Sequence, residues 1–109
     1  MAKFEFFEWL IGFFESNEDF LFEWDKGNFS KSRLKHNVET YQIESCFLDE
    51  RILILGIQIE PKHLEPRYGI IAKDSVGKIL FVCFTIRNGK IRPISGRVAN
   101  KWERDIYEA

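Results

Sequence analysis

Residues 78–86 are hydrophobic at nearly every position, on both alternating sets of side chains. A strand with this pattern needs cover on both of its faces. We therefore predict that it lies in the centre of a sheet. The Asn88-Gly89 pair that follows tolerates positive φ at both corners of a type I′ turn, so a second strand is predicted to run from the turn through Ile94.

The end of the chain carries a helix-start signal. Asn100 is followed three residues later by Glu103, which is the spacing of a capping box. A short final helix is therefore predicted from this point. Trp102 and Ile106 lie at positions i and i+4 of this helix, and we expect them to form its buried stripe.

The chain begins with a second strong pattern, in residues 3–16. One half of a helical wheel over this range is apolar, and the opposite half carries Glu5, Glu8, Gly12 and Glu15. We predict an amphipathic helix whose acidic face argues against an anionic membrane. Its apolar face either packs on the same domain or pairs with its copy in a homodimer. The apolar side chains are Phe4, Phe6, Phe7, Leu10, Ile11, Phe13 and Phe14.

Shorter patterns fill the region between these two. They predict a strand over 20–24, helices over 26–35 and 37–48, and strands over 51–59 and 67–74. The resulting order is β-α-α-β-β-β-β-α, an α+β domain with two helices packed on a mostly antiparallel sheet. Residues 1–19 are interpreted as an N-terminal helical extension and residues 20–109 as the domain.

Composition and charge limit the classes of function. The chain has 109 residues, of which 45% are hydrophobic and 16% aromatic, so it is one folded domain rather than a disordered chain. Its net charge of −1 conceals an asymmetry: residues 1–25 carry one Lys against seven acids, and residues 87–104 carry six basic residues against one acid. A site for an anion is therefore expected in the second part of the chain.

Other sequence signals are weak. Cys46 and Cys83 lack the spacing of a redox or metal motif and are interpreted as free, buried thiols. We find no set of residues with metal-ligand spacing and predict neither a metal nor another cofactor. The chain shows no cleavable signal pattern and no apolar stretch long enough to span a bilayer, which makes the cytoplasm the expected compartment.

A set of short motifs in fixed order carries a family resemblance. The motifs are residues 22–28, Lys31, residues 35–38, residues 67–68, Val82, Phe84 and Thr85, residues 91–97, residues 103–104 and residues 107–108. Together they resemble the BrnT family of ribonuclease toxins. The resemblance implies a RelE-like fold, metal-free RNA cleavage and arrest of translation. It also implies neutralisation by a BrnA-like ribbon-helix-helix antitoxin, through which alone the toxin reaches operator DNA.

Three positions depart from the pattern of the resembled family. Ser32 stands where the family usually has Asn, Ala72 where it has Gly, and Gly96 where it has Ala. These exchanges between small residues threaten packing more than chemistry, although Gly96 also frees the backbone next to the expected site. Residues 1–19 have no counterpart in the shorter members of the family.

Metal-free RNA cleavage requires a base for the 2′-hydroxyl, positive charge on the phosphate and an acid for the leaving 5′-oxygen. Side chains able to supply these roles occur at the matching positions. The catalytic candidates are His36, Arg67, Arg92, Arg97 and Tyr107. The RNA-binding candidates are Lys26, Lys31, Lys35, Ser95 and Lys101.

Each candidate also has a structural interpretation. His36 titrates in a range that suits either proton role, or it satisfies backbone carbonyls at the end of a helix. Arg92 and Arg97 suit phosphate as planar forks, or they form structural ion pairs. Strand alternation places these two arginines on opposite faces unless the chain bulges near Pro93. Tyr107 either serves RNA or packs a helix, and the lysines of a charged helix face often only contact solvent.

Two other classes of function remain open from the sequence. One is a catalytically inactive toxin homologue that retains antitoxin binding and acts only in transcriptional autoregulation. The departures at Ser32 and Gly96 leave room for it. The other is a small RNA-binding module without cleavage.

Overall fold

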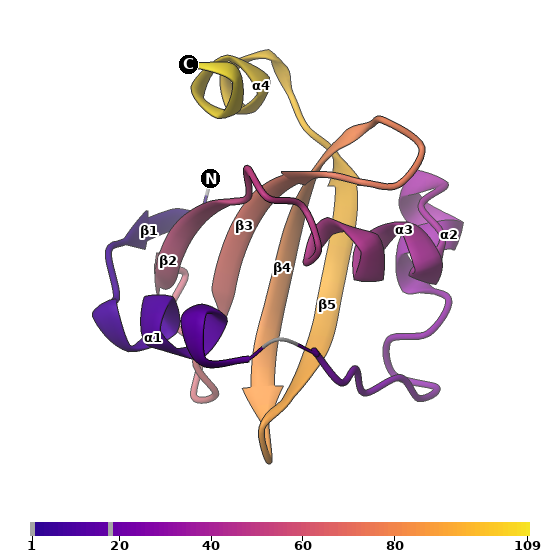
Figure 1. The fold of residues 1–109 in the computed structure, drawn as a ribbon. Helices are drawn as coiled ribbons and strands as arrows, with labels where there is room; N and C mark the ends of the chain where they lie inside the picture. Colours follow the sequence, from indigo (N-terminus) through magenta and orange to yellow (C-terminus); the bar gives the residue numbers. More distant parts are fainter. Residues whose placement is uncertain (1, 18) are drawn as a thin grey trace.

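The computed structural model describes residues 2–17 and 19–109, which form an α+β fold around one antiparallel sheet of five strands in the order β1-β2-β3-β4-β5. Helices α1 and α3 lie over one face of the sheet, α2 lies beside β5, and α4 lies beyond one end of the strands (Figure 1). The elements are β1 (Lys3–Glu5), α1 (Glu8–Ser16), α2 (Lys31–His36), α3 (Thr40–Cys46), β2 (Leu53–Glu60), β3 (Tyr68–Lys73), β4 (Ile79–Arg87), β5 (Lys90–Val98) and α4 (Lys101–Glu108).

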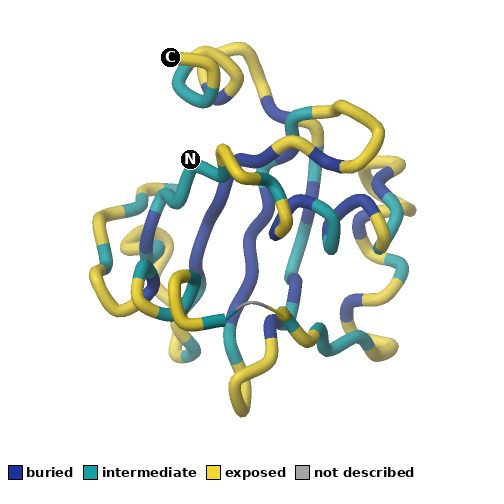
Figure 2. Tube along the Cα trace, in the orientation of Figure 1, coloured by how far each residue is buried: buried dark blue, intermediate teal, exposed yellow. Residues whose placement is uncertain are grey.

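The predicted hairpin and central strand are confirmed. β4 pairs with β3 on one side and β5 on the other, and the middle strands are the most buried part of the chain (Figure 2). Its inner side chains Leu80, Val82 and Phe84 are inaccessible to solvent. At the turn, Asn88 has φ 53° and Gly89 has φ 75°, as the type I′ geometry requires.

The predicted helix over residues 3–16 is wrong at its start. Residues 3–5 form strand β1, which pairs antiparallel with β2, and the helix begins only at Glu8. The apolar spacing suits a helix, but pairing satisfies backbone groups of β2 that would otherwise lie at an open sheet edge. It also places the Phe4 ring edge-on against Phe81, with ring centres 5.8 Å apart.

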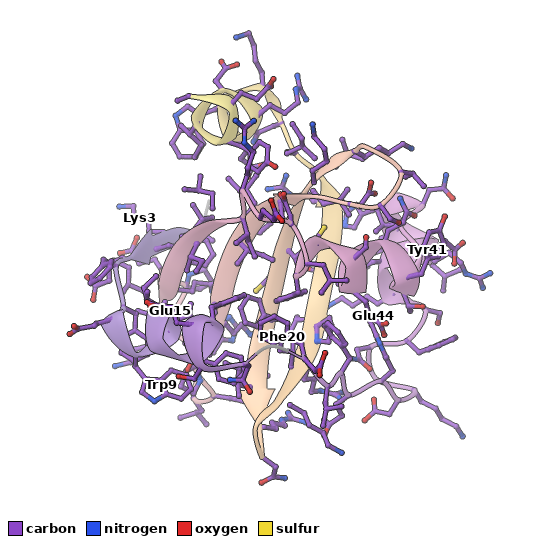
Figure 3. The ribbon with its side chains drawn as sticks, viewed as in Figure 1. Lys3, Trp9, Glu15, Phe20, Tyr41 and Glu44 are labelled. Carbon is purple, nitrogen blue, oxygen red and sulfur yellow. The ribbon has the colours of Figure 1, made fainter. Side chains whose placement is uncertain are left out.

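Helix α1 docks on its own domain. Leu10 is completely buried, and the Phe14 ring stacks on Phe47 and meets Phe84 edge-on. In Figure 3 Phe20, next to the end of α1, lies over the middle of the sheet. The inner face of α1 is therefore covered by the same chain. Leu10 and Phe14 thus belong to the same hydrophobic core as the sheet. The predicted division of the chain after residue 19 stays a prediction from the sequence.

The region between α1 and α3 is less regular than predicted. The expected strand over 20–24 is reduced to one parallel bridge, between Phe22 and Ile91. The expected helix over 26–35 begins only at Lys31, because the side chains before it bond to nearby backbone. Asp25 accepts the Gly27 N–H, and Asn28 accepts the Asp25 N–H. Such local bonds compete with the first turn of a helix.

This irregular segment closes the outer edge of β5. The Glu23 N–H donates to the Ile91 carbonyl and the Ile91 N–H donates to the Leu21 carbonyl, each at 2.8 Å. The Asn28 amide donates to the Pro93 carbonyl at 2.8 Å, inside the protein. An edge strand with its polar groups satisfied in this way offers little to another chain.

Two of the departures from the family pattern meet at this edge. The Ser32 hydroxyl accepts the Gly96 N–H at 2.7 Å in a buried position. A Cβ at Gly96 would lie 2.8 Å from the side chain of Ile43. Gly96 therefore leaves space for core packing, and its backbone needs no left-handed conformation.

The predicted buried stripe of α4 is wrong at Trp102, whose exposure is 63%. The buried residue of this helix is Glu103. The predicted capping box is present, because the Asn100 side chain accepts the Glu103 N–H and the Glu103 carboxylate accepts the Asn100 N–H. The same carboxylate accepts two bonds from Arg97 of β5, so the start of the helix is tied to the sheet at Glu103 while the neighbouring indole is exposed.

We predict that Leu10→Ala lowers the free energy of unfolding by about 2–5 kcal/mol, because it leaves a cavity under α1. Leu34→Ala is the matched control, since Leu34 is 76% exposed, and it should change stability by less than about 0.5 kcal/mol. Urea denaturation measures both. Equal midpoints for Leu10→Ala and the wild type would show that α1 does not contribute to the core.

Candidate RNA-binding and catalytic site

One extra residue in β5 determines which side chains share a face of the sheet. Phe84 pairs with Pro93 and Cys83 pairs with Ser95, so Ile94 is the additional residue of a β-bulge. Arg92 and Arg97 consequently lie on the same face, opposite Thr85 and Phe81 of β4. We call this the outer face, because α1 and α3 cover the other one.

A basic pocket of about 230 Å³ opens on the outer face. Four cations from α2, β4, β5 and the residue before β3 line it. They are Lys31, Arg67, Arg87 and Arg92. Thr85 contributes to the floor, and its hydroxyl donates to the Pro66 carbonyl at 2.6 Å. The fold thus brings together three of the residues predicted as site candidates and adds Arg87, which the sequence argument counted only as part of a basic stretch.

Carboxylates hold Arg92 in position. Its guanidinium donates two bonds to Asp25, at 2.9 and 3.0 Å, and one to Glu23 at 3.0 Å. The hydrogen bond from Arg92 lowers the pKa of the Asp25 carboxyl below its ordinary value. The structural alternative for Arg92, an ion pair, is therefore present in this structure. The guanidinium still lines the pocket.

Arg87 is held in the same manner. It donates two bonds to Glu65, at 2.6 and 2.8 Å, and lies 3.6 Å from Glu23. The bond from Arg87 lowers the pKa of Glu65, so this carboxylate is ionised at neutral pH. The signal for Arg87 in the sequence was its alternation with Thr85, which puts both side chains on one face of the strand.

Lys31 and Arg67 differ from the two paired arginines. Within residues 2–17 and 19–109, neither has a carboxylate oxygen within 4.0 Å. The four cations of the pocket and the carboxylates of Glu23, Asp25 and Glu65 leave one net positive charge. It arises because Lys31 and Arg67 carry two charges that are unpaired among the described residues, while the two paired arginines are surrounded by one carboxylate more than they need.

Arg97 lies in a different environment. It donates two bonds to Glu103, at 2.7 and 2.8 Å, and its guanidinium sits 4.6 Å from the centre of the Phe81 ring. Burial acts to raise the pKa of Glu103, but the bonds from Arg97 and the Asn100 N–H outweigh it and the pKa is lowered. Arg97 and Arg92 share a face without sharing a pocket.

A second hollow adjoins Arg97. It has a volume of about 510 Å³ and lies between the outer face and the start of α4. We call it the apolar groove. Its hydrophobic lining consists of Ala2, Phe4, Leu55, Ile59, Phe81 and Trp102.

The other site candidates are placed outside both hollows. His36 is the last residue of α2 and is exposed, as are Lys26 and Lys35. Lys101 pairs with Asp105 at 2.8 Å on the surface of α4. Ser95 lies between the two hollows, paired with Cys83. The roles predicted for these five residues in RNA binding and proton transfer therefore stay predictions.

Tyr107 is also bound elsewhere, because its hydroxyl donates to the Asp49 carboxylate. Burial and this bond to a carboxylate raise the pKa of Tyr107 to about 12. In this structure the tyrosine therefore links α4 to the loop before β2, which is the packing alternative of the sequence interpretation.

A family model for the ribonuclease toxin BrnT of type II toxin–antitoxin systems matches residues 24–103. The chain belongs to this family. The match contains all four cations of the basic pocket and begins after β1 and α1. Among curated protein sequences, none matches the chain significantly.

Two structural findings accompany the family assignment. Among the described residues, no group of three or more His, Cys, Asp or Glu side chains is placed to hold a metal ion. No helix in the same part of this BrnT chain has the length and apolar character needed to cross a membrane. Cys46 and Cys83 are free and buried, as predicted, and burial raises the pKa of both thiols.

We predict that Glu103→Gln lowers the free energy of unfolding by about 1–2 kcal/mol, because the fork from half-exposed Arg97 loses its ionic partner. Since the folded pKa of Glu103 lies below its ordinary value of 4.5, the difference from wild type should be complete at neutral pH. It should vanish as the pH falls through the folded pKa.

Thermal and urea melts between pH 3 and 8 measure this difference. Asp105→Asn is the control on the same helix, because the Lys101–Asp105 pair is exposed and should contribute less than about 0.5 kcal/mol. A Glu103→Gln difference that stays constant down to pH 3 would contradict an ionic contribution.

Proposed function

We propose that this chain is a metal-independent endoribonuclease toxin whose basic pocket binds the scissile phosphate of RNA. The observation that supports this most is the convergence of Lys31, Arg67, Arg87 and Arg92 on one hollow. In a family of ribonuclease toxins, such a cluster of donors is suited to the charge that builds up on a phosphate during cleavage.

The two kinds of cation in the pocket have different roles in this proposal. Arg87 and Arg92 are fixed by carboxylates before any substrate arrives, so little reorganisation is needed when the phosphate binds. Arg67 and Lys31 provide the attraction, because among the described residues neither forms an ion pair with a carboxylate within 4.0 Å. In this proposal Arg67 and Lys31 bind the phosphate, and Arg87 and Arg92 orient it.

The reaction needs no group beyond RNA and this chain. The 2′-oxygen attacks phosphorus, its proton passes to the Glu65 carboxylate, and the bond from phosphorus to the 5′-oxygen breaks. The Lys31 ammonium gives a proton to the leaving 5′-oxygen. The products are a 2′,3′-cyclic phosphate and a 5′-hydroxyl end. Glu65 is chosen because it is the carboxylate among the pocket's described lining residues.

The cellular role follows from the family. The matching family model describes a toxin of type II toxin–antitoxin systems, and such toxins act with an antitoxin partner. We propose that RNA cleavage by this chain arrests translation in the cytoplasm and that a BrnA-like ribbon-helix-helix antitoxin neutralises it. Operator DNA would be bound by the antitoxin and not by the toxin.

A second candidate is a toxin homologue that binds antitoxin without cleaving RNA. One observation favours it: the guanidiniums of Arg87 and Arg92 are already bonded to Glu23, Asp25 and Glu65. A phosphate has to compete with these carboxylates. The two candidates differ in whether the folded, purified chain cleaves RNA.

We predict that the purified chain cleaves single-stranded RNA at an unchanged rate in excess EDTA and leaves 2′,3′-cyclic phosphate ends, because all of the charge stabilisation comes from side chains. Gel assays with end-group analysis measure this. Loss of activity in EDTA that returns with a divalent ion would contradict the mechanism. Absence of cleavage by the folded chain under all conditions would support the inactive homologue.

We predict that Arg67→Ala slows cleavage by on the order of a hundredfold, since losing one donor to a developing charge typically costs about 3 kcal/mol of barrier. Arg51→Ala is the matched control, because Arg51 is an exposed arginine outside the basic pocket. Both variants should melt close to the wild type. Equal cleavage rates for the two variants would remove Arg67 from the site.

A further inference from the structure

The apolar groove is lined by rings that the family function leaves unexplained. Phe4 and Phe81 form its floor, and Trp102 stands at its edge with 63% of its surface exposed. Trp102 projects from α4, which lies beyond the end of the strands and away from the other helices (Figure 1). An exposed indole beside an apolar hollow provides contact area for a ligand.

The charges around the groove are compensated in pairs. Lys3 pairs with Glu60 at 3.3 Å, and Arg97 pairs with Glu103 at 2.7 Å. The groove therefore has no surplus charge from these groups, unlike the basic pocket, and it suits an uncharged part of a ligand. The guanidinium of Arg97 lies on the Phe81 ring and so adds to a wall of planar groups.

The polar atoms beside the groove are engaged with one another. Glu103 accepts bonds from Arg97 and from the Asn100 N–H, and the side-chain oxygen of Asn100 accepts the Glu103 N–H. These side chains are therefore not free to bond to the backbone of a bound peptide. A ligand held by stacking fits this surface better than one that must form hydrogen bonds.

The groove and the basic pocket lie on the same face of the sheet. Thr85 opposite Arg92 belongs to the pocket, and Phe81 opposite Arg97 belongs to the groove. The two positions are four residue steps apart on β4, which is about 13 Å along an extended strand. A short single-stranded segment can span that distance with its phosphate in one hollow and a base in the other.

We propose that the apolar groove is a base-binding subsite, in which an unpaired nucleobase of the RNA stacks against Trp102 beside Phe81 and Arg97. The inference rests on the proposed function, because it takes the RNA phosphate to occupy the basic pocket. It makes the enzyme selective for single-stranded over duplex RNA, since only unpaired bases can leave their stack to enter the groove.

Binding of a fluorescein-labelled, uncleavable 2′-O-methyl oligonucleotide tests the subsite, with anisotropy as the readout. Trp102→Ala should weaken binding roughly fivefold or more, which corresponds to the loss of one stacked base. Trp102→Phe should retain most of the affinity. Because Trp102 is exposed, both variants should melt close to the wild type.

Trp9→Phe and Trp9→Ala are the matched controls. Trp9 is 53% exposed and projects from α1, on the opposite side of the sheet from the groove (Figure 3). These variants should bind the oligonucleotide as the wild type does. A second control replaces the bases: the same oligonucleotide with abasic sugars should bind wild type and Trp102→Ala equally.

The outcomes separate the inference from the proposed function on which it rests. If Arg67→Ala weakens binding and Trp102→Ala does not, the base-binding subsite is wrong and the phosphate pocket stands. If neither variant weakens binding, both are wrong. If Trp102→Ala leaves RNA binding intact but abolishes antitoxin binding, the groove is a protein-docking site and the inference is overturned.

Discussion

The bulge at Ile94 is the constraint on which the site depends. With regular alternation along β5, Arg92 and Arg97 would lie on opposite faces, one of them directed into the core. The extra residue keeps Gly96 inward, where it leaves space for Ile43, and returns Arg97 to the outer face. One backbone irregularity therefore allows a single strand to pack the core and also to supply cations to both hollows.

The acidic first part of the chain contributes to the basic site. Glu23 and Asp25 come from the segment that closes the edge of β5, and both bond to Arg92. Fixed arginines lose less conformational freedom when they bind an anion, but the carboxylates reduce the net attraction. The attraction of an anion to the pocket therefore comes mainly from Lys31 and Arg67, which have no such ion pairs among the described residues. The same segment thus seals a sheet edge and orients a guanidinium.

The residues before the family match are part of the same body. β1 extends the sheet beside β2, and Leu10 of α1 enters the core. They also complete the apolar groove, because Phe4 forms part of its floor. A chain without these residues would lack part of the lining of the apolar groove.

The sequence by itself determined the elements whose causes are local. Asn88-Gly89 specified the hairpin turn, the capping pair of Asn100 and Glu103 specified the start of α4, and the doubly apolar run specified the central strand. The family motifs indicated the class of toxin. Residues 3–5 were misjudged, because helical spacing is also compatible with a strand when a sheet edge is available to pair with.

Only the tertiary structure decided how these elements combine. The grouping of Arg67 and Arg87 with Lys31, the outward position of Trp102 and the separation of His36 from the pocket all depend on contacts between residues distant in the chain. Periodicity reports which face of an element is apolar. It does not report a bulge, or which carboxylate a guanidinium meets, because those follow from the register and packing of the whole sheet.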